Sequence, residues 1–350
     1  MSILFAILLL AFLILIHELG HFVAAKLSGV QVNEFAIFMG PAICKWKKGE
    51  TQYSIRCIPI GGYCAMEGED EESDNPRAYN KAKWWKRLII LAAGPGMNLV
   101  IGILISLILF LPAKTIITPQ IESIEEYCTI EGLQEGDRIL KIDGERVYNT
   151  SDFSMLLSLN KGNTHDLVVK RDNKKVVLND TLMETHKVLN EYGKEEYLYG
   201  LVFHQKAATF GAKLTEAWYH TVDTIRMVRL SLQMLFTGRA GLKDMTGIVG
   251  IVDVMSESTQ SAANTMDAVM TFLYFGGFIS INLAVMNLLP FPALDGGRIV
   301  ALLLTLVIEK ITKKKLDSKY EAYVHGAGMV LLLILMVVIL FKDVTVLFKR

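Results

Sequence analysis

The hydrophobic pattern of the chain contains long apolar runs at residues 3–25, 88–111, 268–289 and 324–341. A helix needs about 20 mainly apolar residues to cross the hydrocarbon core of a bilayer. Each run therefore predicts a transmembrane helix. Residues 84–87, Trp-Trp-Lys-Arg, precede the second run and have the composition of an interfacial anchor. We expect a polytopic α-helical membrane protein with four transmembrane helices in a lipid bilayer.

Lysine and arginine are concentrated in two of the segments between these runs. Cytoplasmic loops carry an excess of these residues, so both segments are predicted to be cytoplasmic, with the termini and the middle region outside. Lys342, Lys349 and Arg350 favour the opposite orientation, and we give the two loops more weight. The loop residues are Lys45, Lys47, Lys48, Arg56, Lys81, Lys83, Lys86 and Arg87, and then Arg298, Lys310, Lys313, Lys314, Lys315 and Lys319.

The first of these loops contains short segments of β-type composition at residues 34–39 and 51–58. Gly61-Gly62-Tyr63 follows as a turn signal. We expect a membrane-associated β-rich loop near the first apolar run. The acidic stretch at residues 67–74 is interpreted as a solvated loop rather than a cation site.

The middle region, about residues 113–265, is predicted to be the part outside the membrane. Asp143-Gly144 is a hairpin signal, and Thr150 or Ser151 is the expected N-cap of a helix that runs to about Leu159. Strands are expected at residues 119–124, 165–171, 174–178 and 197–204. A helix with Arg226 and Arg229 on its polar side is expected at residues 217–235.

This region resembles a PDZ domain, because residues 132–144 read G-L-x-x-G-D-x-I-x-x-I-D-G. The residues before Gly132 depart from that pattern. Glu125-Glu126-Tyr127-Cys128 stands where a small-residue helix start is common. The region could therefore bind a peptide C-terminus or be a β-rich spacer, and the sequence leaves both interpretations open.

The composition agrees with a membrane protein. Hydrophobic residues make up 52% of the chain, charged residues only 21%, and the formal net charge is zero. A nucleic-acid-binding protein would normally have a basic patch, so we expect no nucleic-acid partner. The spacing of Cys44, Cys57, Cys64 and Cys128 matches no zinc knuckle and predicts reduced thiols. The first run lacks the basic start of a signal peptide, so we expect a retained helix.

The first run also contains H-E-x-x-H, as His17, Glu18 and His21. Histidines at i and i+4 share one face of a helix, so both imidazoles can bind one Zn²⁺ at about 2.0–2.1 Å. Glu18 adjoins the first ligand, where it can take a proton from the attacking water. Three ionisable residues in an apolar span cost several kcal/mol unless they are paired or hydrated, which favours a functional site over a chance match.

A catalytic zinc usually has three protein ligands and one open position, and Asp295 is the best third ligand in the sequence. Pro290 and Pro292 break the third run just before it, while Gly296 and Gly297 permit a close turn. Asp295 could instead be a helix N-cap. Two asparagines of the same region, Asn282 and Asn287, could bind the substrate backbone or the developing oxyanion, or join neighbouring helices.

Several motifs together resemble the site-2 protease family of intramembrane zinc metalloproteases. They are H-E-L-G-H in the first run, A-G-P-x-x-N around Gly94 and Asn98, the PDZ-like insert, and N-x-x-P-x-P-x-L-D-G-G at residues 287–297. The single insert and the four spans resemble the RseP/RasP branch. The usual G-F-G-P element is replaced here by Phe38-Met39-Gly40-Pro41.

The resemblance implies a zinc metalloendopeptidase that cleaves pre-trimmed single-span membrane proteins within the membrane. In the family, such regulated intramembrane proteolysis acts on anti-sigma factors and remnant signal peptides, after an upstream site-1 type protease. His17, His21 and Asp295 would hold the zinc, Glu18 would be the base, and the loop at Gly61-Gly62 would guide the substrate. The protein would be a multi-pass protein of the cell membrane, with its active site facing the cytoplasm.

We expect four regions along the chain. Residues 1–112 form an N-terminal membrane domain, residues 113–206 a PDZ-like α+β domain outside the cell, residues 207–265 an amphipathic connector, and residues 266–350 a C-terminal membrane domain with the third ligand. A non-catalytic membrane adaptor and a cation transporter are the alternatives. The metal motifs disfavour an adaptor, and the scarcity of carboxylates along the other spans disfavours a transporter.

Overall fold

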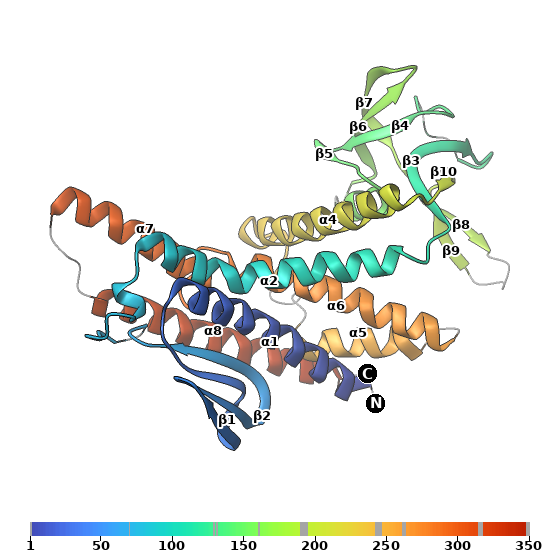
Figure 1. Ribbon diagram of the computed structural model, residues 1–350. Helices are drawn as coiled ribbons and strands as arrows, with labels where there is room; N and C mark the ends of the chain where they lie inside the picture. Colours follow the sequence, from blue (N-terminus) through green and yellow to red (C-terminus); the bar gives the residue numbers. More distant parts are fainter. Residues whose placement is uncertain are drawn as a thin grey trace. The chain divides into compact units, whose positions relative to one another are not determined.

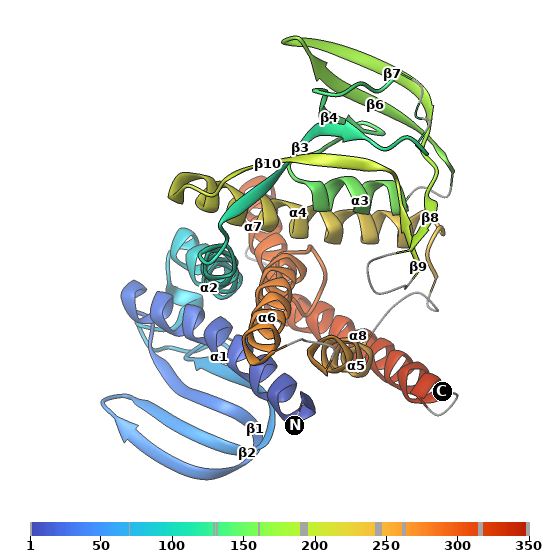
Figure 2. The same cartoon turned by 90° about the vertical axis from the view of Figure 1, so that its right-hand side faces the viewer.

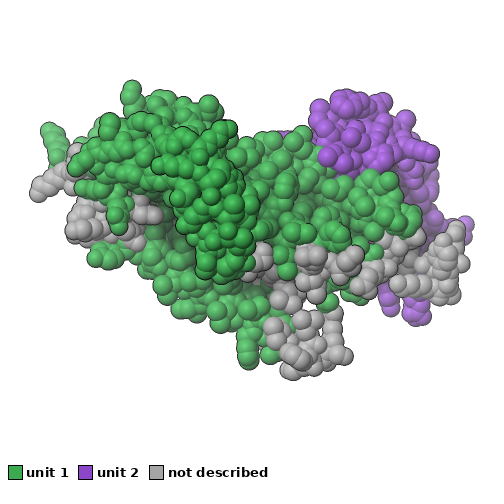
Figure 3. All heavy atoms as spheres, turned by 60° about the horizontal axis from the view of Figure 1, so that its bottom comes forward, with its two compact units in different colours: residues 1–106, 224–350 green, residues 107–223 purple. Residues whose placement is uncertain are grey.

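The computed structural model describes residues 2–69, 71–128, 130, 132–159, 162–189, 195–241, 247–260, 264–313 and 318–347. The chain divides into two compact units (Figure 3). Unit 1 consists of residues 1–106 and 224–350, and unit 2 of residues 107–223.

Long apolar helices confirm the four predicted spans. They are α1 (Ser2–Ser28), α2 (Trp84–Phe110), α6 (Thr265–Asn287) and α8 (Ser318–Leu347). Within the described ranges, these are the helices that are long and apolar enough to cross a membrane. The last residues of α2 belong to unit 2.

Glycines let the helices of unit 1 approach one another closely. A Cβ atom at Gly20 of α1 would lie 2.3 Å from the carbonyl oxygen of Ala93 in α2. A Cβ atom at Gly102 of α2 would lie 2.4 Å from Cγ1 of Ile281 in α6. Small residues commonly permit such contacts between transmembrane helices. α2 is therefore packed between α1 and α6, with Gly20 against the backbone of α2 and Gly102 against the side chain of Ile281.

The first loop forms a larger β structure than its composition predicts. Strands β1 (Val32–Lys48) and β2 (Thr51–Met66) are antiparallel and both strongly curved (Figure 1). Each bends, so that their segments lie side by side in the order 42–48, 51–56, 32–37 and 62–66. Phe38, Gly40 and Gly61 have positive φ angles of 71°, 84° and 77° at the bends. The prediction was too short because these breaks interrupt the alternation that marks a strand.

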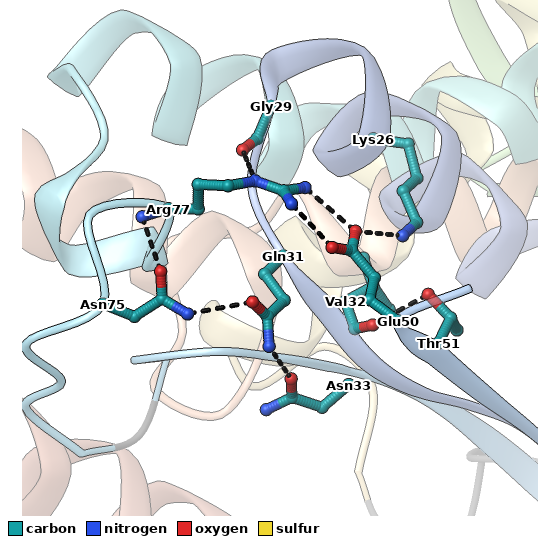
Figure 4. A network of polar contacts seen from close by, with 9 residues as sticks. All are labelled: Lys26, Gly29, Gln31, Val32, Asn33, Glu50, Thr51, Asn75 and Arg77. Atoms are coloured by element: carbon teal, nitrogen blue, oxygen red, sulfur yellow. Dashed lines mark hydrogen bonds and ion pairs between the residues drawn. The ribbon is translucent and has the colours of Figure 1, made fainter. Parts of the chain in front are cut away.

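The curved sheet is fixed to the C-terminal end of α1 by a polar network (Figure 4). Glu50, in the turn between β1 and β2, accepts hydrogen bonds from Arg77 at 2.6 and 2.9 Å and from Lys26 at 2.6 Å. Arg77 also donates to the carbonyl oxygen of Gly29 at 3.2 Å. The hydrogen bonds from Arg77 and Lys26 lower the pKa of Glu50 to about 2. The turn is therefore held by an ionised carboxylate over the physiological pH range.

The acidic stretch after β2 is not simply a solvated loop, so that prediction was wrong in part. Glu67 accepts hydrogen bonds from Asn33 and Ser73. The Glu69 side chain is only 15% exposed and forms an ion pair with Arg298. Asp70 lies outside the described residues. This pattern was missed because Arg298 is far away in the sequence.

The remaining helices of unit 1 surround the spans. α5 (Ile248–Gln260) contacts α1, α6 and α8, and α7 (Asp295–Thr312) contacts α8 (Figure 2). The predicted helix at residues 217–235 is confirmed as part of α4 (Phe210–Phe236), which begins in unit 2. Arg229 is exposed as expected, but Arg226 is only 7% exposed, so its place on an exposed polar side was wrong. All four cysteines are free thiols, as predicted.

Unit 2 is an antiparallel sheet in the order β10-β3-β4-β6-β7, with β5 paired to β4. Its core contains Phe153 of helix α3 (Thr150–Leu159) and the buried strand residues Ile121, Ile139, Leu167 and Val169. The strands are β3 (Thr115–Ile124), β4 (Arg138–Ile142), β5 (Glu145–Arg146), β6 (Thr164–Arg171), β7 (Lys174–Leu182) and β10 (Leu201–Ala207).

Two details of unit 2 differ from prediction. Helix α3 (Thr150–Leu159) is capped by Asn149, whose Oδ1 accepts from the Asp152 amide at 2.9 Å, and not by Thr150 or Ser151. The Asp152 carboxylate accepts in return from the Asn149 amide, which makes a capping box. The expected strand 197–204 is divided at Gly200, where φ is 70°, into β9 (Glu195–Leu198) and β10. β9 pairs instead with β8 (His186–Leu189).

Asp137 forms the buried ion pair of this unit. Its fully buried carboxylate accepts from Arg171 at 2.8 and 2.7 Å and from the Gln134 amide at 3.0 Å. Arg171 also donates to the carbonyl oxygen of Gly132 at 2.6 Å. The pair therefore joins β6 to the loop that precedes β4.

We predict that Arg171→Met destabilises unit 2 by about 3 kcal/mol, because a buried carboxylate loses its cation. Pulse proteolysis of the full-length protein across a urea series, read at sites within residues 107–223, measures the change. Lys187→Met is the control. It breaks an exposed pair with Glu195, and exposed pairs contribute less than about 1 kcal/mol. Equal shifts in both variants would contradict the prediction.

Candidate metal centre

His17 and His21 lie one turn apart on the same face of α1. Their Nε2 atoms are 3.2 Å apart. His21 is 8% exposed, and both rings face α2, because a Cβ atom at Gly94 would be in contact with each Nε2. As the i, i+4 spacing predicted, the two imidazoles direct one nitrogen each at the same position.

Asp295 joins the two histidines of α1 from a distant part of the chain, at the first position of α7. Its Oδ2 atom is 3.0 Å from Nε2 of His17 and 3.4 Å from Nε2 of His21. All three ligand atoms lie within 4.8 Å of one another. Leu294, rather than Asp295, occupies the N-cap position of α7. The carboxylate completes a set of two nitrogens and one oxygen.

The turn between α6 and α7 brings Asp295 to this position. Cβ atoms at Gly296 and Gly297 would lie 2.3 Å from the Leu288 carbonyl oxygen and 2.1 Å from the Phe291 carbonyl oxygen, so no larger residue fits. Ala293 has a positive φ angle of 77° in this turn. Its amide donates a hydrogen bond to Nδ1 of His325 in α8 at 3.0 Å. Irregular backbone near the spans is thus hydrogen-bonded by a side chain, as burial in an apolar environment requires.

The donor set and the space around it fit a zinc ion. Two imidazoles and one carboxylate are ligands that zinc binds in catalytic sites. At Gly94 of α2, a Cβ atom would lie 2.3 Å from Nε2 of His21 and 2.9 Å from Nε2 of His17. The glycine therefore keeps this side of the ligand atoms clear of side-chain atoms.

One hydrogen bond fixes the orientation of the His21 ring. Nδ1 of His21 is 2.8 Å from the carbonyl oxygen of Ile90 in α2. A carbonyl oxygen only accepts, so Nδ1 donates its proton and leaves the Nε2 lone pair for a metal. Such a partner on the second nitrogen is usual for histidines that bind metals.

Glu18 lies beside the outer segment of the curved sheet. A Cβ atom at Gly62 would be 3.5 Å from Cγ of Glu18 and 3.0 Å from the Ala36 carbonyl oxygen. Gly61 packs against Met39 at the bend. Of the two glycines predicted to guide substrate, Gly62 is therefore next to the predicted base.

A second carboxylate stabilises the sheet near these glycines. Glu34 accepts hydrogen bonds from Ser54 at 2.6 Å and Arg56 at 2.8 Å, and Arg56 donates to the Gly40 carbonyl oxygen at 2.6 Å. Burial alone would raise the pKa of Glu34, but the hydrogen bonds from Ser54, Arg56 and Tyr63 lower it to about 2. The bend at Gly40 is therefore tied to the centre of the sheet.

Asn282 and Asn287 lie half-buried in the last two turns of α6, directly before the turn that leads to Asp295. This placement fits either of the roles considered for them.

The sequence did not indicate that two residues of α2 lie beside the histidines. Gly94 and Asn98 belong to the A-G-P-x-x-N motif, yet their proximity to the histidines depends on how α2 packs on α1. Nor does the sequence predict the Glu69–Arg298 pair, which joins the end of β2 to the helix that begins with Asp295.

Comparisons with known proteins agree with this centre. The model of peptidase family M50 matches residues 5–335. Proteins of Clostridium acetobutylicum and Clostridium perfringens are 40% and 38% identical to the chain, and each alignment covers 98% of this chain and 97% and 98% of the relative. Both have the name "Putative zinc metalloprotease". The Bacillus subtilis "Regulator of sigma-W protease RasP" is 28% identical, over 96% of each chain.

These matches cover nearly the whole chain and define its class, which is that of the membrane zinc metalloproteases. The chain belongs to peptidase family M50, the site-2 proteases. The resemblance inferred from the motifs is thereby confirmed, together with the expectation of a zinc-dependent protease.

We predict that Gly94→Ala lowers zinc binding by at least about tenfold, because the added methyl group occupies the space beside both Nε2 atoms. Chelator competition on the purified, detergent-solubilised protein measures the affinity. Gly96→Ala on the same helix is the matched control, since a Cβ atom there meets nothing within 4 Å. Unchanged affinity in Gly94→Ala would show that this glycine does not adjoin the metal.

Proposed function

We propose that His17, His21 and Asp295 hold the catalytic zinc ion and that Glu18 is the general base of peptide hydrolysis. The observation that supports this most strongly is the convergence of Asp295 Oδ2 on both Nε2 atoms, at 3.0 and 3.4 Å. Zinc bound at such a site supplies a water ligand of pKa about 7 and polarises the scissile carbonyl. A membrane adaptor has no need of this ligand set.

Glu18 is suited to move the proton in this reaction. It adjoins His17 in the sequence and is not one of the three clustered ligands, so its carboxylate is available to accept a proton from the attacking water. The same carboxyl group then donates that proton to the amine of the leaving peptide. Gly62 beside it leaves room for a substrate backbone.

The substrate is proposed to bind as an extended strand at the outer segment of the curved sheet. The segment at residues 51–56 has strand partners on both sides and therefore has no free edge for a substrate. Residues 62–66 pair only with residues 32–37 among the described strands. An unpaired edge can accept a further strand through backbone hydrogen bonds, and here it begins next to Glu18.

The other polar groups near the turn would complete substrate binding. We propose that Asn282 and Asn287 bind the substrate backbone, with Gly61 and Gly62 admitting it at the sheet edge. Within α6, both asparagines lie toward the end that leads to Asp295. Peptide bonds in a helix have their carbonyls hydrogen-bonded to the chain, so a substrate must be unwound before these groups can bind it.

The proposed substrates are transmembrane segments of single-span proteins that an upstream site-1 type protease has already shortened. The relative named "Regulator of sigma-W protease RasP" supports a role in regulated intramembrane proteolysis. Anti-sigma factors or remnant signal peptides are the substrates that we propose from the family resemblance. Basic residues in the two short loops support a cell-membrane protein with its active site facing the cytoplasm.

Unit 2 is proposed to be a PDZ-like domain outside the cell that restricts access by bulky substrates. Its support is the G-D-x-I-x-x-I-D-G pattern, in which Asp137 forms the buried ion pair and Asp143 and Gly144 form the β4–β5 turn. The four-region division, with the PDZ-like part at residues 113–206 and a connector at residues 207–265, belongs to the same proposal.

We predict that Glu18→Gln retains zinc but loses proteolysis, because the amide cannot accept the proton. Asp295→Ala is expected to lose both activity and most of the metal. Metal analysis and cleavage of a membrane-embedded reporter, both on purified protein, check the two outcomes. A full complement of zinc in Asp295→Ala would remove this carboxylate from the ligand set.

Removal of residues 115–207 is predicted to let untrimmed substrates be cleaved. The structure offers a suitable junction, since the Ala208 amide donates to the Lys114 carbonyl oxygen at 3.0 Å. Cleavage of full-length and pre-shortened reporters by both proteins is compared. If the deletion variant still cuts only the shortened reporter, unit 2 does not restrict access.

Substrates that unwind easily are predicted to be cleaved faster. Each unsatisfied backbone group costs several kcal/mol in hydrocarbon, and glycine favours a helix less than alanine by about 1 kcal/mol. A transmembrane reporter with Gly or Asn near the cut should be cleaved faster than an all-Leu counterpart at equal insertion, in detergent and in bilayers. Equal rates across the series would indicate a side-chain pocket instead.

A further inference from the structure

Asn98 of α2 is a buried polar residue to which the mechanism above assigns no role. Its relative exposure is zero, and its side-chain Oδ1 has no hydrogen-bond partner among the described residues. A buried amide oxygen without a partner is unfavourable, because it has lost its hydrogen bonds to water and gained none in return. An atom of this kind in a fully buried position calls for a ligand or a partner that becomes available in another state.

The amide of Asn98 is in contact with the second nitrogen of His17. Nδ2 of Asn98 lies 3.4 Å from Nδ1 of His17, while Nε2 of the same ring faces Asp295 and His21. The backbone of Asn98 is fixed as well, because its carbonyl oxygen accepts from the buried Ser280 hydroxyl at 2.7 Å. The amide is therefore held at the rear of the ring.

The two orientations of the amide correspond to the two tautomers of His17. If Nδ2 faces the ring, it donates to Nδ1, and the proton of a neutral ring is then on Nε2. If the amide is turned by 180°, Oδ1 faces Nδ1 and accepts its proton, which leaves the lone pair on Nε2. A zinc ion can bind Nε2 only in the second arrangement.

We propose that Asn98 is a positioning residue of the metal centre, whose Oδ1 accepts a hydrogen bond from Nδ1–H of His17 and directs the Nε2 lone pair at the zinc position. The proposal rests on the assignment of His17 as a zinc ligand. Asn98 then does for His17 what the Ile90 carbonyl oxygen does for His21. The difference is that an amide can rotate, so it suits the ring with and without metal, whereas a carbonyl group only accepts.

Zinc affinity is the first test, measured by chelator competition on the purified full-length protein in detergent. Asn98→Leu keeps the approximate size of the side chain but cannot accept a hydrogen bond, and is expected to bind zinc 10–100-fold more weakly. Ser106→Ala is the control, because it removes another buried polar group of α2 and should leave the affinity unchanged. Zinc affinity of Asn98→Leu equal to wild type would overturn the proposal.

The tautomer is the second test and separates positioning from packing. Nitrogen NMR of the zinc-loaded, histidine-labelled protein should show His17 protonated at Nδ1, with its signals identified by their absence in His17→Gln. Asn98→Asp, which can only accept, should keep this tautomer. Its added charge also attracts the cation, so the spectrum and not the affinity decides for this variant. A His17 ring without a proton on Nδ1 in the loaded wild-type enzyme would overturn the proposal.

Two further measurements distinguish the possible causes of failure. Thermal unfolding of the metal-free variants shows whether Asn98→Leu is folded. If it is not, the wild-type and Asn98→Asp spectra decide. His17→Ala and Asp295→Ala are titrated in the same assay. If both retain wild-type zinc affinity, the assignment of the metal site is wrong, whereas loss in these two without loss in Asn98→Leu is a failure of the Asn98 proposal alone.

Discussion

The close contact between α1 and α2 is the interaction on which the candidate metal centre depends. Ionisable side chains are costly within an apolar span unless their polar atoms have partners. Gly20 on α1 and Gly94 on α2 remove the side chains that would otherwise separate the two helices. The backbone of α2 can then supply the Ile90 carbonyl oxygen to His21, and the Asn98 amide comes within reach of His17. The hydrogen bonds that orient the two histidines therefore depend on the close packing of α1 and α2.

The second requirement is that a carboxylate from a distant part of the chain reach the same position. An uninterrupted α6 would continue along its own axis, so the helix has to end before Asp295. Gly296 and Gly297 allow the backbone to fold back on the carbonyls of residues 288–291, and Nδ1 of His325 accepts a hydrogen bond from the Ala293 amide. The Glu69–Arg298 pair then ties the first turn of α7 to the end of β2. The ligand, the turn and the curved sheet are thus mechanically connected within unit 1.

Local patterns in the sequence were sufficient for the four spans and for the three candidate ligands that cluster, whereas α5 and α7 were not predicted. Long apolar runs and a motif with i, i+4 spacing depend only on neighbouring residues, and the Pro and Gly residues around Asp295 are a strong local signal. The curved sheet was predicted too short, because its bends at Phe38, Gly40 and Gly61 disrupt the alternation. The N-cap of α3 was predicted at Thr150 or Ser151 instead of Asn149, because Asn, Thr and Ser are all good N-cap residues. Contacts such as Glu69–Arg298 and Asn98–His17 depend on tertiary packing, which no local pattern encodes.

The hydrogen bond between Lys114 and Ala208 has a consequence for how this chain can change over evolutionary time. The segment at residues 115–207 begins and ends at neighbouring positions, because Lys114 and Ala208 are hydrogen-bonded to each other. A change within this segment therefore need not move the two points at which it joins the rest of the chain. Lengthening such a loop costs little, since its closure entropy grows only with the logarithm of its length. An inserted module could therefore be enlarged, shortened or exchanged while the protease around it stays as it is.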